Sequence, residues 1–242
     1  MRTPATAPTR KEEPRLRADA LRNRERIVAA ARELFVEHGA EIPLDEVARR
    51  AGVGNATLYR HFSDRDDLIR RVTLHVTERI ITAAETALAE EPDGFEALCR
   101  FVHAAVAERI GALCPLLAGA GRNHAESNGA KDGQNDTRND TQNDARNDGS
   151  DENTVARERL GRAVEALMER ARASGRLRDD VETGDLLVAV TQLTRPLPST
   201  GCAEFDRFVH RHLRLFLDGL QAPARSELPG SAATWEDLRQ RT

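Results

Sequence analysis

Apolar residues recur along most of the chain at the spacing of helix faces. In the segment 18–38 they return every three or four positions, and Gly39 follows as a typical helix stop. In the segment 63–91 apolar residues recur at every fourth position, after Asp64 as a candidate N-cap, and this pattern predicts one long helix. Shorter apolar stripes predict further helices over 44–50, 55–61, 95–110, 155–174, 185–194 and 205–220. Because alternating runs rich in Val, Ile and Thr are missing, we expect an all-α fold.

Composition separates helical segments from polar ones. Residues 1–17 are rich in Pro, Thr and charge, and we expect a disordered basic arm. Residues 122–153 hold almost no apolar side chain and contain the repeat NDTR NDTQ NDAR NDGS, so we expect a disordered insert. Residues 221–242 are polar, and we expect a disordered tail. Two helical domains remain, 18–63 and 64–220, with the insert inside the second.

Charge is uneven along the chain. The formal net charge is −4, yet the first 26 residues hold eight Lys or Arg and four Asp or Glu, so the remainder carries −8. A basic front on an acidic body suggests a local anionic partner, and Arg22 and Arg24 of this front are candidate contacts to it. For residues 1–15 alone, a solvated tail explains the charge equally well.

Cysteine content and hydropathy indicate the compartment. The three cysteines, Cys99, Cys114 and Cys202, are an odd number without paired spacing. No apolar leader precedes the first helix, and no apolar run is long enough to span a membrane. We therefore expect a protein of the reducing cytoplasm without a membrane partner, whose cysteines are small buried hydrophobes.

Two short predicted helices, 44–50 and 55–61, are joined by the glycine-containing turn Ala51–Gly54 and preceded by a longer helix. This arrangement predicts a helix-turn-helix, whose second helix enters the major groove of DNA. Leu58 and Phe62 share one face of that helix and should pack inward. The outer set is then Asn55, Ala56, Thr57, Tyr59, Arg60 and His61. An ordinary helical hairpin with solvated polar residues fits the same spacing.

The outer set carries chemistry suited to DNA. The hydroxyls of Thr57 and Tyr59 and a ring nitrogen of His61 can donate to phosphate oxygens. The small residues Gly54 and Ala56 let the backbone approach the groove, and the methyl group of Ala56 can contact thymine. Double-stranded DNA is therefore the predicted partner.

The segment IPLDEVARRAGVGNATLYRHFSDRDDLI resembles the signature of the tetracycline-repressor-like (TetR/AcrR) family. The matching pieces are the pair Val47-Ala48, the triplet AGV, the string TLYRHF, the basic Arg65 and Leu68. The resemblance implies a helical homodimer that usually represses transcription. Its first three helices would bind DNA, and its later helices would bind a small-molecule effector and pair the subunits.

Carried over by motif position, the resemblance implies phosphate contacts from Thr57, Tyr59 and His61, with Asn55 and Ala56 near base edges. Arg65, where the family typically has lysine, would reach a phosphate from the start of the fourth helix. The expected DNA-binding residues are Gly54, Asn55, Ala56, Thr57, Tyr59, Arg60, His61, Arg65, Arg22 and Arg24. The sequence departs from the family at Pro43, which replaces a Ser or Thr cap, and at the Asn/Asp insert.

The second predicted domain, 64–220, carries the candidate effector pocket and the candidate pairing helices. A mostly apolar effector pocket with one polar handle, His103, would be lined by Phe95, Cys99, Phe101, His103, Leu113, Cys114 and Leu117. Each of these residues is also a plausible core residue. The stripes 160–171 and 186–193 either pair two subunits or close the subunit's own core. A two-fold dimer would read a near-palindromic operator.

An enzyme and a helical protein-interaction module are the alternative classes. No nucleophile motif, glycine-rich phosphate loop or metal-ligand spacing is present, so no catalytic residue, cofactor or metal site is predicted. Cys99 and His103 are four residues apart, but two ligands do not make a zinc site. The Asp-rich repeat lacks the glycine and glutamate positions of a calcium loop. The basic front and the polar outer face of 55–61 count against an interaction module.

Overall fold

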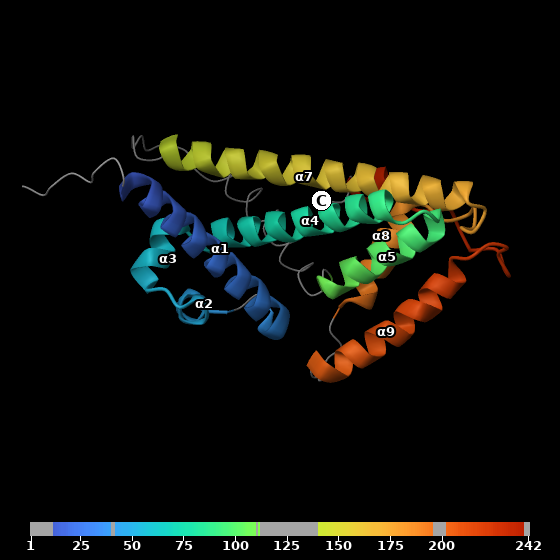
Figure 1. Ribbon diagram of the computed structural model, residues 1–242, viewed down its shortest axis with the longest axis horizontal. Coiled ribbons are helices and arrows are strands. Elements are labelled where there is room, and N and C mark those ends of the chain that lie inside the picture. Colours follow the sequence, from blue (N-terminus) through green and yellow to red (C-terminus); the bar gives the residue numbers. More distant parts are fainter. Residues whose placement is uncertain (1–11, 40–41, 110, 112–139, 196–201, 240–242) are drawn as a thin grey trace, which may run out of the picture. The chain divides into compact units, whose positions relative to one another are not determined.

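The computed structural model describes residues 12–39, 42–109, 111, 140–195 and 202–239 (Figure 1). Within these ranges every regular element is a helix, and the one β contact is an isolated bridge between Leu177 and Gln221. The all-α prediction is thus confirmed. In the same ranges, no helix has the length and apolar character needed to cross a membrane.

The helices follow the order that the apolar pattern predicts, apart from one short helix at 235–239 that the pattern does not predict. Their bounds are α1 Glu12–His38, α2 Leu44–Ala51, α3 Asn55–His61, α4 Arg65–Glu90, α5 Gly94–Ala107, α7 Asp140–Ala173, α8 Thr183–Leu193, α9 Cys202–Gly219 and α10 Trp235–Arg239. The chain divides into two compact units, residues 1–68 and 69–242, so the boundary lies inside α4. We had expected it between residues 63 and 64, just before α4 begins.

The first unit is built on the apolar faces of α1, α2 and α3. Helix α1 contributes the buried side chains Ile27, Leu34 and Phe35. Helix α2 lies against α1 and contributes Val47 and Ala48. These residues fall at helical spacing, so one face of each helix leaves water and the opposite face stays polar.

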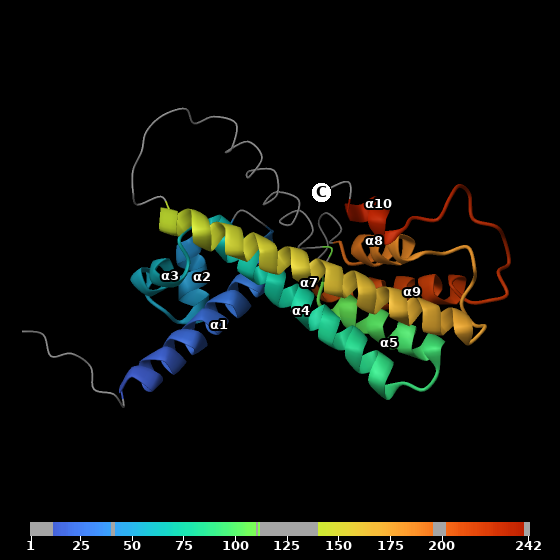
Figure 2. The same cartoon turned by 90° about the horizontal axis from the view of Figure 1, so that it is seen from above.

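In the second unit, α5 packs closely on α7, and Figure 2 shows it beside the C-terminal half of α7. Gly94 makes the approach possible, because a Cβ there would lie 2.3 Å from the carbonyl oxygen of Arg170. The Arg170 guanidinium in turn donates to the carbonyls of Glu91 at 2.6 Å and Pro92 at 3.0 Å. It thereby satisfies backbone acceptors at and beyond the end of α4, where carbonyls have no helical partner.

The two stripes proposed for subunit pairing lie in the core of the chain itself. Val164, Leu167 and Met168 of α7 are fully buried, as are Leu186 and Val190 of α8. Of the two interpretations left open, closure of the subunit's own core is the one that these side chains support. These buried faces are therefore not available for contact with a second subunit.

Two helices begin earlier than the sequence predicts. Helix α1 starts at Glu12 rather than Ala18, and its first turn holds two acids and a proline, which helix starts tolerate. Helix α7 starts at Asp140, inside the expected disordered insert. Once a helix has nucleated, each added residue costs little, so α7 extends into a segment whose Asn and Asp residues are only modest helix formers. The remainder of the expected insert, 122–139, lies outside the described residues.

The C-terminal segment also differs from the disordered tail that we expected. Its backbone is held by side chains of the loop before α8 and of α8 itself: Leu228 N donates to Asp180 Oδ2 at 3.3 Å, and Ala233 N to Asp185 Oδ1 at 3.1 Å. The short α10 then lies beside α8 (Figure 2). A Cβ on Gly161 would lie 2.5 Å from the Trp235 ring, so α10 is seated directly on a glycine of α7.

Trp235 is the only tryptophan of the chain, so the fluorescence of the protein reports the packing of its ring against Gly161. Gly161→Ala should displace the ring and shift the emission to longer wavelength, because the added methyl occupies its place. Arg162→Ala, at the exposed neighbouring position, is the matched control and should leave the emission unchanged. Wild-type emission from Gly161→Ala would mean that the tail is not docked there in solution.

Candidate nucleic-acid interface

The turn between α2 and α3 requires glycine at its first position. Gly52 has φ +64°, the left-handed region, and its N–H donates to Arg49 O at 3.1 Å. Val53 N closes the turn on Ala48 O at 3.0 Å. From α1, Arg26 Nη2 donates to Gly52 O at 3.3 Å and lies 2.7 Å from where a Cβ on Gly52 would be. Arg26 thus braces the turn, a role that periodicity in the sequence does not reveal.

Helix α3 divides sharply into an inner and an outer face. Leu58 on α3 and Phe62 just after it are fully buried, as predicted. The only tyrosine of the chain, Tyr59, is 57% exposed, although tyrosine has a large apolar body that burial would stabilise. The remaining exposed positions are Gly54, Asn55, Ala56 and Arg60, while Thr57 and His61 are half-buried.

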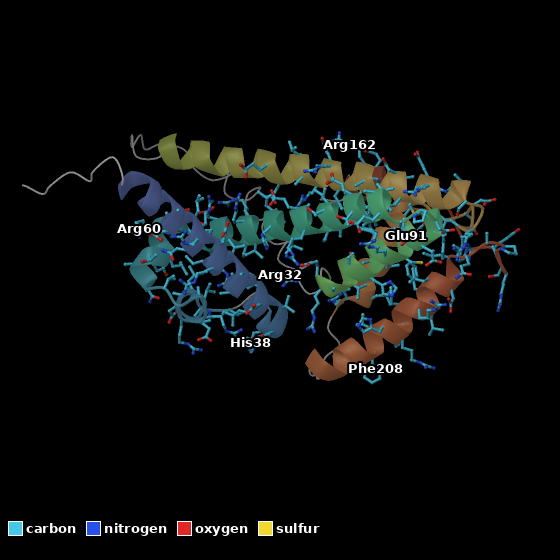
Figure 3. All side chains as sticks on the ribbon, viewed as in Figure 1. Arg32, His38, Arg60, Glu91, Arg162 and Phe208 are labelled. Atoms are coloured by element: carbon cyan, nitrogen blue, oxygen red, sulfur yellow. The ribbon has the colours of Figure 1, made fainter. Side chains whose placement is uncertain are left out.

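Five arginines of this unit differ in whether a carboxylate pairs with them. Arg49 is paired with Glu46, Arg50 with Glu33 and Glu37, and Arg22 with Asp19. For Arg24 and Arg60, by contrast, no carboxylate of the described residues lies within ion-pair distance. Figure 3 labels Arg60 on the unit that holds α3. Two cations without an internal counter-ion can neutralise an external anion at no cost to an existing ion pair.

His61 lies beside both of these arginines. Its Nε2 is buried and has no hydrogen-bond partner among the described residues. Burial lowers the pKa of His61 below its ordinary value of 6.5, and the charges of Arg60 and Arg24 lower it further. The guanidinium of Arg24 stands over the ring of Phe62, 5.7 Å from its centroid. Arg24 and His61, predicted from different parts of the sequence, are therefore brought together.

Arg65 is placed differently from the other predicted contacts. Its Nη1 donates to the backbone carbonyl of Ile42 at 2.6 Å, and its guanidinium stands 6.0 Å from the centroid of the Phe35 ring. The Nη2 atom is buried without a hydrogen-bond partner in the described part of the chain. Pro43, as expected, gives the start of α2 no side-chain cap.

The four predicted effector residues that the structure describes differ in their environment. Phe95 and Phe101 are buried core, whereas His103 is exposed and its Nδ1 donates to Cys99 O at 2.8 Å. Cys99 is half-buried, and burial, assisted by the charge of Glu96, raises the pKa of its thiol to about 11. The other three residues, Leu113, Cys114 and Leu117, lie outside the described residues. Among the side chains that the structure describes, no three His, Cys, Asp or Glu gather as metal ligands would.

Two family models match the chain. Residues 27–72 match the bacterial regulatory proteins of the tetR family, and residues 93–222 match the C-terminal domain of SbtR-like transcriptional regulators. The HTH-type transcriptional regulator SAB2452 of Staphylococcus aureus is 48% identical over 54 residues, which are 22% of this chain and 29% of that protein. The match to such curated relatives thus spans less than a third of their length.

Solved structures are similar over most of the chain. The TetR transcriptional regulator SCO0520 from Streptomyces coelicolor is 28% identical, with a TM-score of 0.57 over 83% of this chain and 99% of that one. A TetR transcription regulatory protein from Mycobacterium vanbaalenii is 30% identical, with a TM-score of 0.52 over 86% and 99%. LfrR from Mycobacterium smegmatis, solved in complex with proflavine, shares the fold at 19% identity, with a TM-score of 0.52 over 86% and 98%.

Proposed function

Because this chain belongs to the TetR family of DNA-binding transcriptional regulators, rather than to a family of enzymes, we propose that it is a repressor that a small-molecule effector releases from its operator. The observation that carries the proposal is the outer face of α3. Its largest side chain, Tyr59, is exposed next to cations that have no carboxylate partner among the described residues. The cytoplasm, where bacterial DNA lies, is the proposed location.

The outer face of α3 would enter the major groove. Thr57 and Tyr59 would donate their hydroxyls to phosphates, and His61 would donate from a ring nitrogen. Gly54, Asn55 and Ala56 would lie near base edges, while Arg24 and Arg60 would neutralise phosphate charge. Arg22 already has a partner in Asp19, so its contribution would be smaller.

A second copy of the chain would pair through α8 and α9. Phe208, which Figure 3 labels on α9, and Leu215 are exposed, and because they are seven residues apart they share one face of that helix. Val188 is an exposed apolar residue of α8, and α8 contacts α9. A two-fold dimer would place two recognition helices roughly 34–36 Å apart, one turn of DNA, and would read a near-palindromic operator.

The effector would act on the second unit. The structural relative LfrR was solved in complex with proflavine, which supports a small-molecule effector for this chain without identifying it. Helix α4 belongs to both units, so a ligand that favours one setting of α4 would change the population of DNA-competent dimers. The shift is limited by the ligand's difference in affinity for the two settings.

Selection of bound duplexes from a random DNA pool tests the proposal. Enrichment of a near-palindrome is expected, and release of that duplex by compounds from a screen would establish the effector step. If the folded, dimeric protein enriches no sequence at low salt, the assignment of α3 as a recognition helix is wrong.

Tyr59→Phe should weaken operator binding without changing the melting temperature. A hydrogen bond to a charged group contributes about 1.5–3 kcal/mol, so the loss should be roughly tenfold or more for each subunit. Filter binding or fluorescence anisotropy at matched salt measures it. Wild-type affinity would show that the Tyr59 hydroxyl does not touch DNA.

Operator affinity should rise as the pH falls from 7.5 to 6. The lowered pKa favours the neutral form of His61 in the free protein, whereas a nearby phosphate favours the cation, so binding takes up a proton. The gain in operator affinity begins as the pH falls to the pKa of His61 in the complex. It is complete once the pH lies below the pKa of His61 in the free protein. It cannot exceed about tenfold per pH unit for each His61. His61→Gln should lose this component of the pH profile, and an unchanged profile would contradict the contact.

A further inference from the structure

Arg65 joins three elements of the first unit. It is the first residue of α4, it donates to the carbonyl of Ile42 in the loop before α2, and it stands over the ring of Phe35 on α1. Both Ile42 and Phe35 are buried, so the guanidinium is drawn toward the protein rather than toward solvent. The sequence alone suggested the opposite, a side chain that reaches outward to a phosphate.

The start of α2 depends on this contact more than most helix starts would. Pro43 precedes α2 without a side-chain cap, and the first-turn amides of Glu46 and Val47 donate to Pro43 O at 3.1 and 3.4 Å. The carbonyl that Arg65 holds belongs to the residue directly before Pro43. By fixing Ile42 O, Arg65 therefore fixes the entry of the chain into α2, and α2 carries the turn that sets the angle of α3.

Helix-capping hydrogen bonds hold the α4 end of this link. Asp64 and Asp67 form a capping pair at the start of α4, since Asp64 Oδ1 accepts from Asp67 N at 2.8 Å and Asp67 Oδ2 from Ser63 N at 3.1 Å. The planar guanidinium can donate to Ile42 and stack over Phe35 together, which a lysine ammonium would not reproduce. A movement of the first turn of α4 is thus passed directly to the backbone before α2.

We propose that Arg65 is a positioning residue: it ties the first turn of α4 to the entry of α2 and so sets the recognition helix, instead of contacting a DNA phosphate. The inference rests on the proposed function for its effect on DNA, but the tie itself belongs to the DNA-free protein. The proposal assigns the link between α4 and the helix-turn-helix to the Arg65 side chain and the Ile42 carbonyl.

Hydrogen exchange of the DNA-free protein tests the tie. Arg65→Met keeps the length of the side chain and removes its donors, so the amides of Glu46 and Val47 should exchange faster than in the wild type. Arg60→Met is the matched control, because Arg60 is exposed and has no carboxylate partner in the described residues; exchange of these two amides should not change. Wild-type exchange in Arg65→Met overturns the proposal whatever the DNA result.

Salt dependence of operator binding separates positioning from phosphate contact. A lost phosphate contact lowers the slope of log K against log salt by about 0.9 for each subunit. Arg65→Met should keep the wild-type slope while the preference for operator over random DNA falls about tenfold or more, whereas Arg60→Met should lower the slope. A lower slope in Arg65→Met would assign the side chain to a phosphate and overturn the proposal.

A milder variant covers the case in which Arg65→Met melts below the assay temperature. Arg65→Lys keeps the charge but loses the planar fork, and faster exchange at Glu46 and Val47 is again expected; wild-type exchange contradicts the proposal. If the wild-type protein selects no DNA sequence at all, the proposed function fails, yet the exchange data still decide whether Arg65 ties α4 to α2.

Discussion

Phe62→Ala should unfold the DNA-binding unit at temperatures where the second unit remains helical. The Phe62 side chain is fully buried behind α3, and removal of a buried phenylalanine costs about 3–5 kcal/mol. The cavity would also take away the ring that lies under Arg24. A small unit has only about 5–15 kcal/mol of stability to lose, so the expected result is a separate, earlier melting transition and loss of operator binding.

Circular dichroism melts and operator binding measure both effects in one preparation. Tyr59→Ala is the matched control, since it removes an aromatic side chain three positions earlier that is mostly exposed; its melting curve should match the wild type. An unchanged melt in Phe62→Ala would mean that α3 does not depend on this packing.

Leu215→Arg should convert the proposed dimer into monomers and lower operator affinity more than a hundredfold. Leu215 is 62% exposed on the same face of α9 as Phe208, and an arginine there would be desolvated without a partner at a two-fold interface. Two linked half-site contacts bind about 10²–10⁴ times more tightly than one. Because the substitution lies outside the DNA-binding unit, affinity for a single half-site should be unchanged.

Analytical ultracentrifugation and binding to full and half operators distinguish the outcomes. Val155→Arg is the control: Val155 is 61% exposed on α7, so the same charge is introduced at an equally exposed apolar position away from α9. A Leu215→Arg protein that stays dimeric with full operator affinity would place the pairing surface elsewhere.

Local features of the fold were predictable from the sequence. Leu58 and Phe62 lie inward because burial follows helical spacing, and Asp64 caps α4 because capping involves neighbours in the chain. The exposed face of α3 follows from the same spacing. The family resemblance then supplied a function that periodicity alone leaves open between DNA binding and an ordinary hairpin.

Contacts between residues far apart in sequence were not predictable. The acceptor of Arg65 is a backbone carbonyl 23 positions away, and a carbonyl leaves no trace in the residue type. The seat of Trp235 on Gly161 likewise depends on two segments that tertiary structure alone brings together. Apolar spacing also cannot tell a core phenylalanine from one that lines a pocket, which is why Phe95 and Phe101 were candidates for both.

Helix α4 passes from one unit to the other without a linker, and this continuity limits how family members can be recombined. A glycine-serine connection would tolerate insertions, because its two ends rotate freely. One residue inserted into a helix instead turns everything beyond it by about 100° and moves it by about 1.5 Å, while seven residues nearly restore the angle. A DNA-binding unit transplanted into this chain from a relative should therefore be joined within α4 at a position that conserves the length of this helix.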